Sequence, residues 1–106
     1  MKYYRKKLGL TQTEFAKWFG RSRPWLAHRE NGRFPPTSTE LMKAKNMVEN
    51  SWIIEESPQD ASKFVVCKRG QIAYRLNGKE MDYRTAKKVV RRLNENEKVE
   101  GLKIWK

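Results

Sequence analysis

The residues best suited to chemistry in this sequence are cations, a tryptophan and the only histidine, gathered within residues 21–33. Arg21, Arg23 and Arg33 carry permanent charge, and Trp25 and His28 lie between them. Because arginine stays charged and bonds anionic oxygens strongly, the cluster favours a polyanionic partner. The elements that surround these residues decide whether the cluster can act as one surface.

The first half of the chain is predicted to form four short helices. Two capping boxes, Thr11 with Glu14 and Thr37 with Glu40, mark the starts of the second and fourth helices. Ser22 with Pro24 favours the start of the third, and glycines stop the first three. The helices are expected over residues 1–8, 11–19, 22–30 and 37–50.

A tight turn at residues 20–22 joins the second and third predicted helices into a helix-turn-helix. Such a unit projects its second helix, and a helix fits the major groove of DNA, which is about 12 Å wide. Leu26 is the residue of this helix expected to face inward. The others that stand out are bulky or cationic: Arg23, Trp25, His28 and Arg29.

An ordered series of residues extends this pattern over much of the first half. It comprises LTQTEFA (residues 10–16), FGRSR (19–23), Leu26, RENG (29–32), Pro36 and Leu41. With these residues, segment 4–48 resembles the Xre/Cro-type helix-turn-helix family, also called lambda-repressor-like DNA-binding domains. The resemblance implies an all-helical domain that binds DNA through its third helix, usually as a dimer on a palindromic site.

The resemblance also implies roles for matching positions near the start of the third helix. Gln12 is expected to contact a phosphate or to brace that helix. Arg23 is expected to read a base, because arginine bonds O6 and N7 of guanine, and its alternative is a phosphate contact. Pro24 falls at a base-contact position of the family, but we favour the interpretation that it initiates the helix. His28 falls at a second base-contact position, and the alternative is that its side chain is solvated.

The remaining expected contacts flank the third helix. Asn31 and Arg33 follow it and Arg21 precedes it. The resemblance implies that Asn31 holds phosphate; Arg33 and Arg21 are candidates for the same role, and the alternative for both is an ordinary solvated surface. Trp25 departs from the family's small polar residues, so it either contacts DNA or a partner, or packs against neighbouring elements. The expected DNA-binding residues are Gln12, Arg21, Arg23, Pro24, Trp25, His28, Asn31 and Arg33.

The second half is predicted to be a small ββαβ unit. Strands are expected over 63–68 and 71–76, a helix over 82–93 and a last strand over 102–105. The helix has an apolar face and a basic face, and the basic face is either solvated or a second phosphate-binding surface. That possible accessory surface comprises Arg84, Lys87, Lys88, Arg91 and Arg92.

Together the halves predict an α+β chain with a helix-turn-helix domain of four to five helices. We expect domains over residues 1–52 and 63–106, with a polar linker over 53–62. A small sheet with free edges favours dimerisation through the second domain.

Composition limits the class of protein. The chain has 106 residues and a net charge of +12, to which both halves contribute. It shows neither an apolar run long enough for a membrane span nor a signal peptide. The lone Cys67 and the basic charge favour the cytoplasm, near the nucleoid. We expect no enzyme activity, cofactor or metal site, because phosphate loops and Cys/His clusters are missing; Glu55, Glu56 and Asp60 favour a solvated loop over a nuclease site.

The sequence therefore predicts a sequence-specific DNA-binding regulator. The resemblance to this family favours a repressor from a phage, plasmid or toxin–antitoxin operon. Two alternatives stay open: a protein-docking inhibitor, and an RNA-binding protein that uses the basic second half, with DNA binding as autoregulation.

Overall fold

The computed structural model describes residues 1–68 and 73–104, and within them the chain is α+β, as predicted. Its helices are α1 (Lys2–Lys7), α2 (Gln12–Trp18), α3 (Arg23–Glu30), α4 (Ser38–Glu49) and α5 (Tyr83–Asn94). Its strands are β1 (Trp52–Glu56), β2 (Phe64–Lys68), β3 (Tyr74–Leu76) and β4 (Leu102–Ile104).

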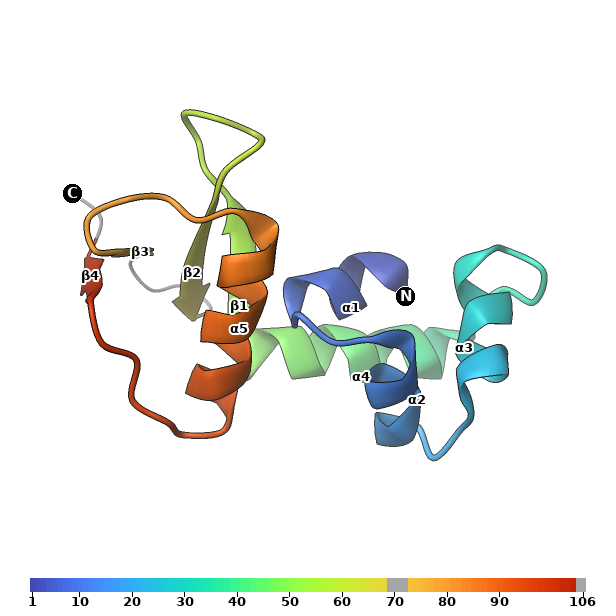
Figure 1. Cartoon of the computed structure of the whole chain (residues 1–106). Helices are drawn as coiled ribbons and strands as arrows, with labels where there is room; N and C mark the ends of the chain where they lie inside the picture. Colours follow the sequence, from blue (N-terminus) through green and yellow to red (C-terminus); the bar gives the residue numbers. More distant parts are fainter. Residues whose placement is uncertain (69–72, 105–106) are drawn as a thin grey trace.

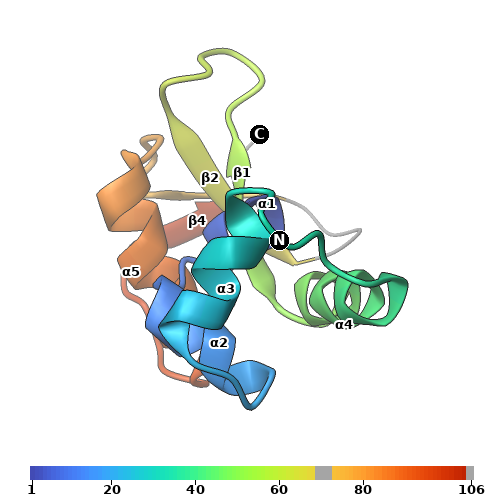
Figure 2. The same cartoon turned by 90° about the vertical axis from the view of Figure 1, so that its right-hand side faces the viewer.

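The strands form one antiparallel sheet in the order β1-β2-β3-β4, and α5 packs on β1 and β2 (Figure 1). The four N-terminal helices lie beyond β1, and α3 is at the end of the molecule farthest from β4 (Figure 1). Figure 2 looks onto that end, with α3 in front and α5 and α4 on either side. The helix-turn-helix and most of the sheet therefore occupy opposite ends of the molecule.

The segment 53–62 is not a linker over its first part, because residues 53–56 belong to β1. Five residues of β1 pair in register with β2, from Trp52 opposite Lys68 to Glu56 opposite Phe64. Adjacent Ile53 and Ile54 are both buried, on opposite faces of the strand. A strand buried on both faces lacks the alternation of polar and apolar residues that usually identifies a strand in a sequence. Without that alternation, the acidic residues that follow Ile54 suggested a linker.

β1 lies between two hydrophobic cores. Ile53 joins the core of the N-terminal helices, where Phe15, Leu26 and Ala44 are fully buried. Ile54 joins the core between α5 and the sheet, with Val66, Val90 and neighbouring residues. The two halves thus share a strand, and the position of α5 relative to the helix-turn-helix follows from that strand.

Direct contacts reinforce this junction. The Tyr83 hydroxyl donates to the Lys6 carbonyl at 2.7 Å, and Lys7 Nζ pairs with the Glu55 carboxylate at 2.6 Å. The Asn94 side chain bonds both the N–H and the carbonyl of Trp52, at 2.7 and 3.0 Å. Since these are backbone groups at the sheet edge, Asn94 occupies sites that another strand would otherwise take.

The predicted helix starts are present in the structure, with one difference in side-chain bonding. Both predicted capping boxes are formed, whereas Ser22 is an N-cap without a side-chain bond. Leu41, which carries part of the family pattern, is exposed on α4. The second predicted strand extends over 71–76, of which residues 71–72 lie outside the described residues, as does the predicted end of the last strand at residue 105.

Candidate nucleic-acid interface

α3 has one fully buried residue in the N-terminal core and presents its first turn to solvent. Leu26 is fully buried in the N-terminal core. Arg23 and Pro24 are exposed in the first turn, where the proline sits at a position that tolerates the missing N–H. The structure therefore exposes Arg23 and Pro24, two of the three residues predicted at base-contact positions.

Gln12 connects the start of α2 to both ends of α3. Its Oε1 accepts a hydrogen bond from Arg23 Nε at 3.1 Å, and its Nε2 donates to Glu30 Oε1 at 3.1 Å. This is the bracing arrangement, one of the two roles expected for Gln12. Because the bond uses Nε, both terminal nitrogens of Arg23 remain to bond another group.

Glu30 in turn is held by Arg5 of α1. Arg5 donates Nε at 2.6 Å and Nη2 at 3.0 Å to the two oxygens of Glu30, and Nη1 at 3.1 Å to the Leu10 carbonyl. The Glu30 and Arg5 side chains are only 5% and 14% exposed. Burial alone would raise the pKa of Glu30, but the bonds from Arg5 and Gln12 hold that pKa below its ordinary value.

No pattern in the sequence predicts this chain of contacts. Arg5 and Glu30 are 25 residues apart, so no local spacing links them. The available signal was the single carboxylate at the end of an otherwise basic predicted helix. A buried acid in such surroundings requires a paired cation, and only the fold shows which one.

Trp25 lies in packing between elements, which was the alternative to a contact with DNA. Its ring is half-buried and contacts Phe19 at 5.5 Å between centroids. The guanidinium of Arg29 covers it at 4.8 Å and that of Arg21 at 5.8 Å. Arg29 Nε also donates to Glu40 at 3.3 Å, so its snorkelling side chain joins α3 to α4.

The end of α3 and the following loop are shaped by their own side chains. Asn31 Oδ1 accepts from the backbone N–H of Arg33 at 2.9 Å, and both residues are exposed. The His28 ring meets Phe34 edge-on at 5.5 Å, and its buried Nδ1 makes no hydrogen bond within the described residues. Asn31 and Arg33 are therefore accessible to phosphate, while His28 is half-buried against the loop.

The five cations of α5 do not form one free face. Lys87 packs so closely on Gly9 that a Cβ there would lie 3.2 Å from its Cγ. Arg91 forms an ion pair with Glu14 of α2. Burial alone would raise the pKa of Glu14, but bonds from Thr11 and the nearby Arg91 charge lower it. The exposed members of the predicted accessory set are Arg84, Lys88 and Arg92.

Three further observations concern metal ligands, membrane-spanning helices and the Cys67 thiol. Within residues 1–68 and 73–104, no group of three or more metal-ligating side chains comes together. No helix in that part is long and apolar enough to cross a bilayer. Burial raises the pKa of the half-buried Cys67 thiol, and nearby Glu55 raises it further.

Comparisons of the chain with protein-family models, with curated proteins and with solved structures gave no match. The resemblance of segment 4–48 to the Xre/Cro-type family therefore stays a prediction from its residues. The geometry around α3 is the basis for a functional proposal.

Proposed function

We propose that this chain is a sequence-specific DNA-binding regulator that places α3 in the major groove. The observation that carries the proposal is the exposed Arg23, held through Gln12 by the buried Glu30–Arg5 pair. A guanidinium oriented before binding loses less side-chain entropy on contact with a base. The terminal nitrogens of Arg23 then bond O6 and N7 of one guanine.

Phosphate contacts on both sides of α3 complete this interface. Arg21 precedes the helix, and Asn31 and Arg33 follow it, all exposed. The net charge of +12 supplies the general attraction to a polyanion. Pro24 and His28 would contribute apolar or hydrogen-bonding contacts between the phosphates. Trp25 would act indirectly, by fixing α3 against α2 and α4.

We further propose that α5 contacts phosphate next to the helix-turn-helix. α5 docks beside the start of α2, through Arg91 with Glu14 and Lys87 on Gly9. Arg84, Lys88 and Arg92 stay exposed on that same helix. Contacts from these residues would add affinity without sequence preference.

The regulator is proposed to act as a homodimer on a palindromic operator, as a repressor in the cytoplasm. β4 is an outer strand of the sheet, and Ile104 on it is 48% exposed. Pairing of two such edges would join two copies of the chain, with one α3 at each end of the dimer (Figure 1). Sedimentation of the protein with and without operator DNA tests the stoichiometry.

Selection of bound sequences from random DNA tests the function directly. The expected result is an enriched palindrome whose half-site includes a guanine read by Arg23. Arg23→Ala should weaken binding to that site by about 1–3 kcal/mol and relax the preference at one position. Arg92→Ala is the matched control, because it should weaken specific and random DNA equally. Enrichment of no motif, or an unchanged preference in Arg23→Ala, would refute the proposal.

A further inference from the structure

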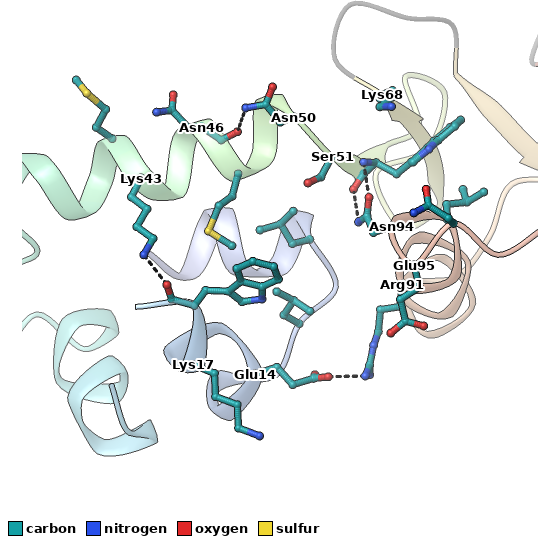
Figure 3. Close-up of a pocket in the computed structure, with 18 of the residues that line it drawn as sticks. Glu14, Lys17, Lys43, Asn46, Asn50, Ser51, Lys68, Arg91, Asn94 and Glu95 are labelled. Atoms are coloured by element: carbon teal, nitrogen blue, oxygen red, sulfur yellow. Dashed lines mark hydrogen bonds and ion pairs between the residues drawn. The ribbon is translucent and has the colours of Figure 1, made fainter. Parts of the chain in front are cut away.

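A long groove separates the helix-turn-helix from the C-terminal half, on a surface that includes no residue of segment 21–33. It encloses about 1130 Å³ between α2, α4 and the end of α5 (Figure 3). One whole face of α4 forms a wall, at i, i+3 and i+4 spacing from Ser38 to Asn50. A helix of 12 residues is about 18 Å long, so the groove accommodates about three turns of a second helix.

Two large, exposed apolar side chains line the groove. Trp18 is 60% exposed and Met42 65% exposed, and both line it. Leu10, Met47 and Leu93 add partly buried apolar surface. Contiguous apolar surface with flexible methionines is typical of sites that receive an amphipathic helix.

The charge of the lining is predominantly positive. Lys17, Lys43, Lys68 and Arg91 face two acids, Glu14 and Glu95. Glu14 is already paired with Arg91, and Lys43 Nζ donates to the Trp18 carbonyl at 2.5 Å (Figure 3). The rim therefore offers Lys17 and Lys68 to an anionic partner.

We propose that this groove binds a short, acidic, amphipathic helix of another protein. Its apolar face would cover Trp18 and Met42, and its carboxylates would face Lys17 and Lys68. A second copy of this chain fits the groove less well, because none of its described helices is predominantly acidic. Leucine and methionine outnumber tryptophan in the lining, which favours a helix over a nucleic acid that stacks on aromatic side chains; these residues are Leu8, Leu10, Met42, Met47 and Leu93, against Trp18 and Trp52. Since the groove lies apart from α3, partner and DNA can bind together.

The test uses a labelled synthetic peptide of about 15 residues made of Leu, Ala and Glu, with Leu at helical i, i+3, i+4 and i+7 positions. A scrambled peptide of identical composition controls for simple charge attraction to the basic chain. Fluorescence anisotropy measures both affinities at several salt concentrations. The amphipathic peptide is expected to bind at least about tenfold more tightly than the scrambled one.

Variants of the protein locate the site. Trp18→Ser and Met42→Ser should each weaken the amphipathic peptide severalfold, and Lys17→Glu with Lys68→Glu should weaken it further. Tyr3→Ser is the matched control, because Tyr3 is equally exposed but lies outside the groove. None of the four side chains replaced in the groove forms a hydrogen bond or ion pair described above, so these variants should keep the thermal unfolding of the parent. Thermal unfolding is checked for each variant, including Tyr3→Ser, because the Tyr3 ring contacts Tyr4 and lies under Lys7 Nζ.

Three outcomes would overturn the proposal. The first is equal affinity for the amphipathic and scrambled peptides, and the second is unchanged affinity in Trp18→Ser and Met42→Ser. The third is a different occupant of the groove. That would be shown by a dimer that Trp18→Ser dissociates, or by oligouridine binding that Trp18→Ser abolishes while the amphipathic peptide does not compete.

Discussion

Arg23 of α3 and Arg91 of α5 both contact α2, but their surroundings are opposite. Arg23 is exposed and bonded to a neutral amide, Gln12, so its charge is oriented but not cancelled. Arg91 is bonded to the Glu14 carboxylate and joins α5 to α2, so its charge is already compensated. The comparison shows that the net charge of +12 is not one binding surface. Part of it holds the two halves together, and part is left for a partner.

The largest effect should follow from removing the acid on which the orientation of Arg23 depends. Glu30→Ala leaves the Arg5 guanidinium, only 14% exposed, without its carboxylate. The free energy of unfolding should fall by about 2–3 kcal/mol, measured by urea denaturation. Glu97→Ala, at an exposed position after α5, is the control and should change stability little. A Glu30→Ala protein as stable as the control would show that the pair does not hold α1 to α3.

Three bonded glutamates, Glu30 among them, predict how the stability of the fold responds to acid. Glu14, Glu30 and Glu40 have pKa values lowered in the fold, so their contribution is complete above the ordinary glutamate pKa of about 4.3. It is lost as the pH falls through the lowered values, because the unfolded chain then binds more protons. The melting temperature should therefore drop between about pH 5 and pH 3. Glu30→Gln should flatten this drop, and a profile identical to the parent's would contradict the assignment.

Much of the first half was predictable because its signals are local. A capping box needs residues three apart, and Thr11 with Glu14 and Thr37 with Glu40 form as predicted. The positions of Arg23 and Pro24 follow from the predicted start of α3 at Ser22. The Arg5–Glu30 pair was not predictable, because it depends on how two helices pack.

The second half shows where sequence patterns stop being informative. The helix α5 was expected from its two faces, and Ala86, Val89 and Val90 are buried as its apolar face requires. The pattern could not show that Lys87 and Arg91 contact the N-terminal half of the same chain. β1 was missed for a related reason: Ile53 and Ile54 are buried in different cores, and Lys7 compensates Glu55.

Replacing each of the two arginines separately by alanine should give the next smaller effect on stability. Arg91→Ala should lower the free energy of unfolding by at most about 1 kcal/mol, because the pair with Glu14 is partly exposed and screened. It should leave the sequence preference for DNA unchanged, whereas Arg23→Ala should change the preference and spare stability. Both properties are measured on each variant by urea denaturation and by binding to selected and random DNA. A changed preference in Arg91→Ala would contradict the division between the two arginines.

The smallest effect tests whether α5 adds a second surface for phosphate. Replacing Arg84, Lys88 and Arg92 together by Ala removes the exposed cations of α5 and spares Lys87 and Arg91, which hold the halves together. Each lost phosphate contact should reduce the slope of log Kobs against log salt by about 1, equally for selected and random DNA. The triple variant should keep the urea midpoint of the parent, since these side chains are solvated. An unchanged slope would leave α3 and its flanking loops as the whole DNA-binding surface, and the exposed face of α5 as an ordinary solvated face.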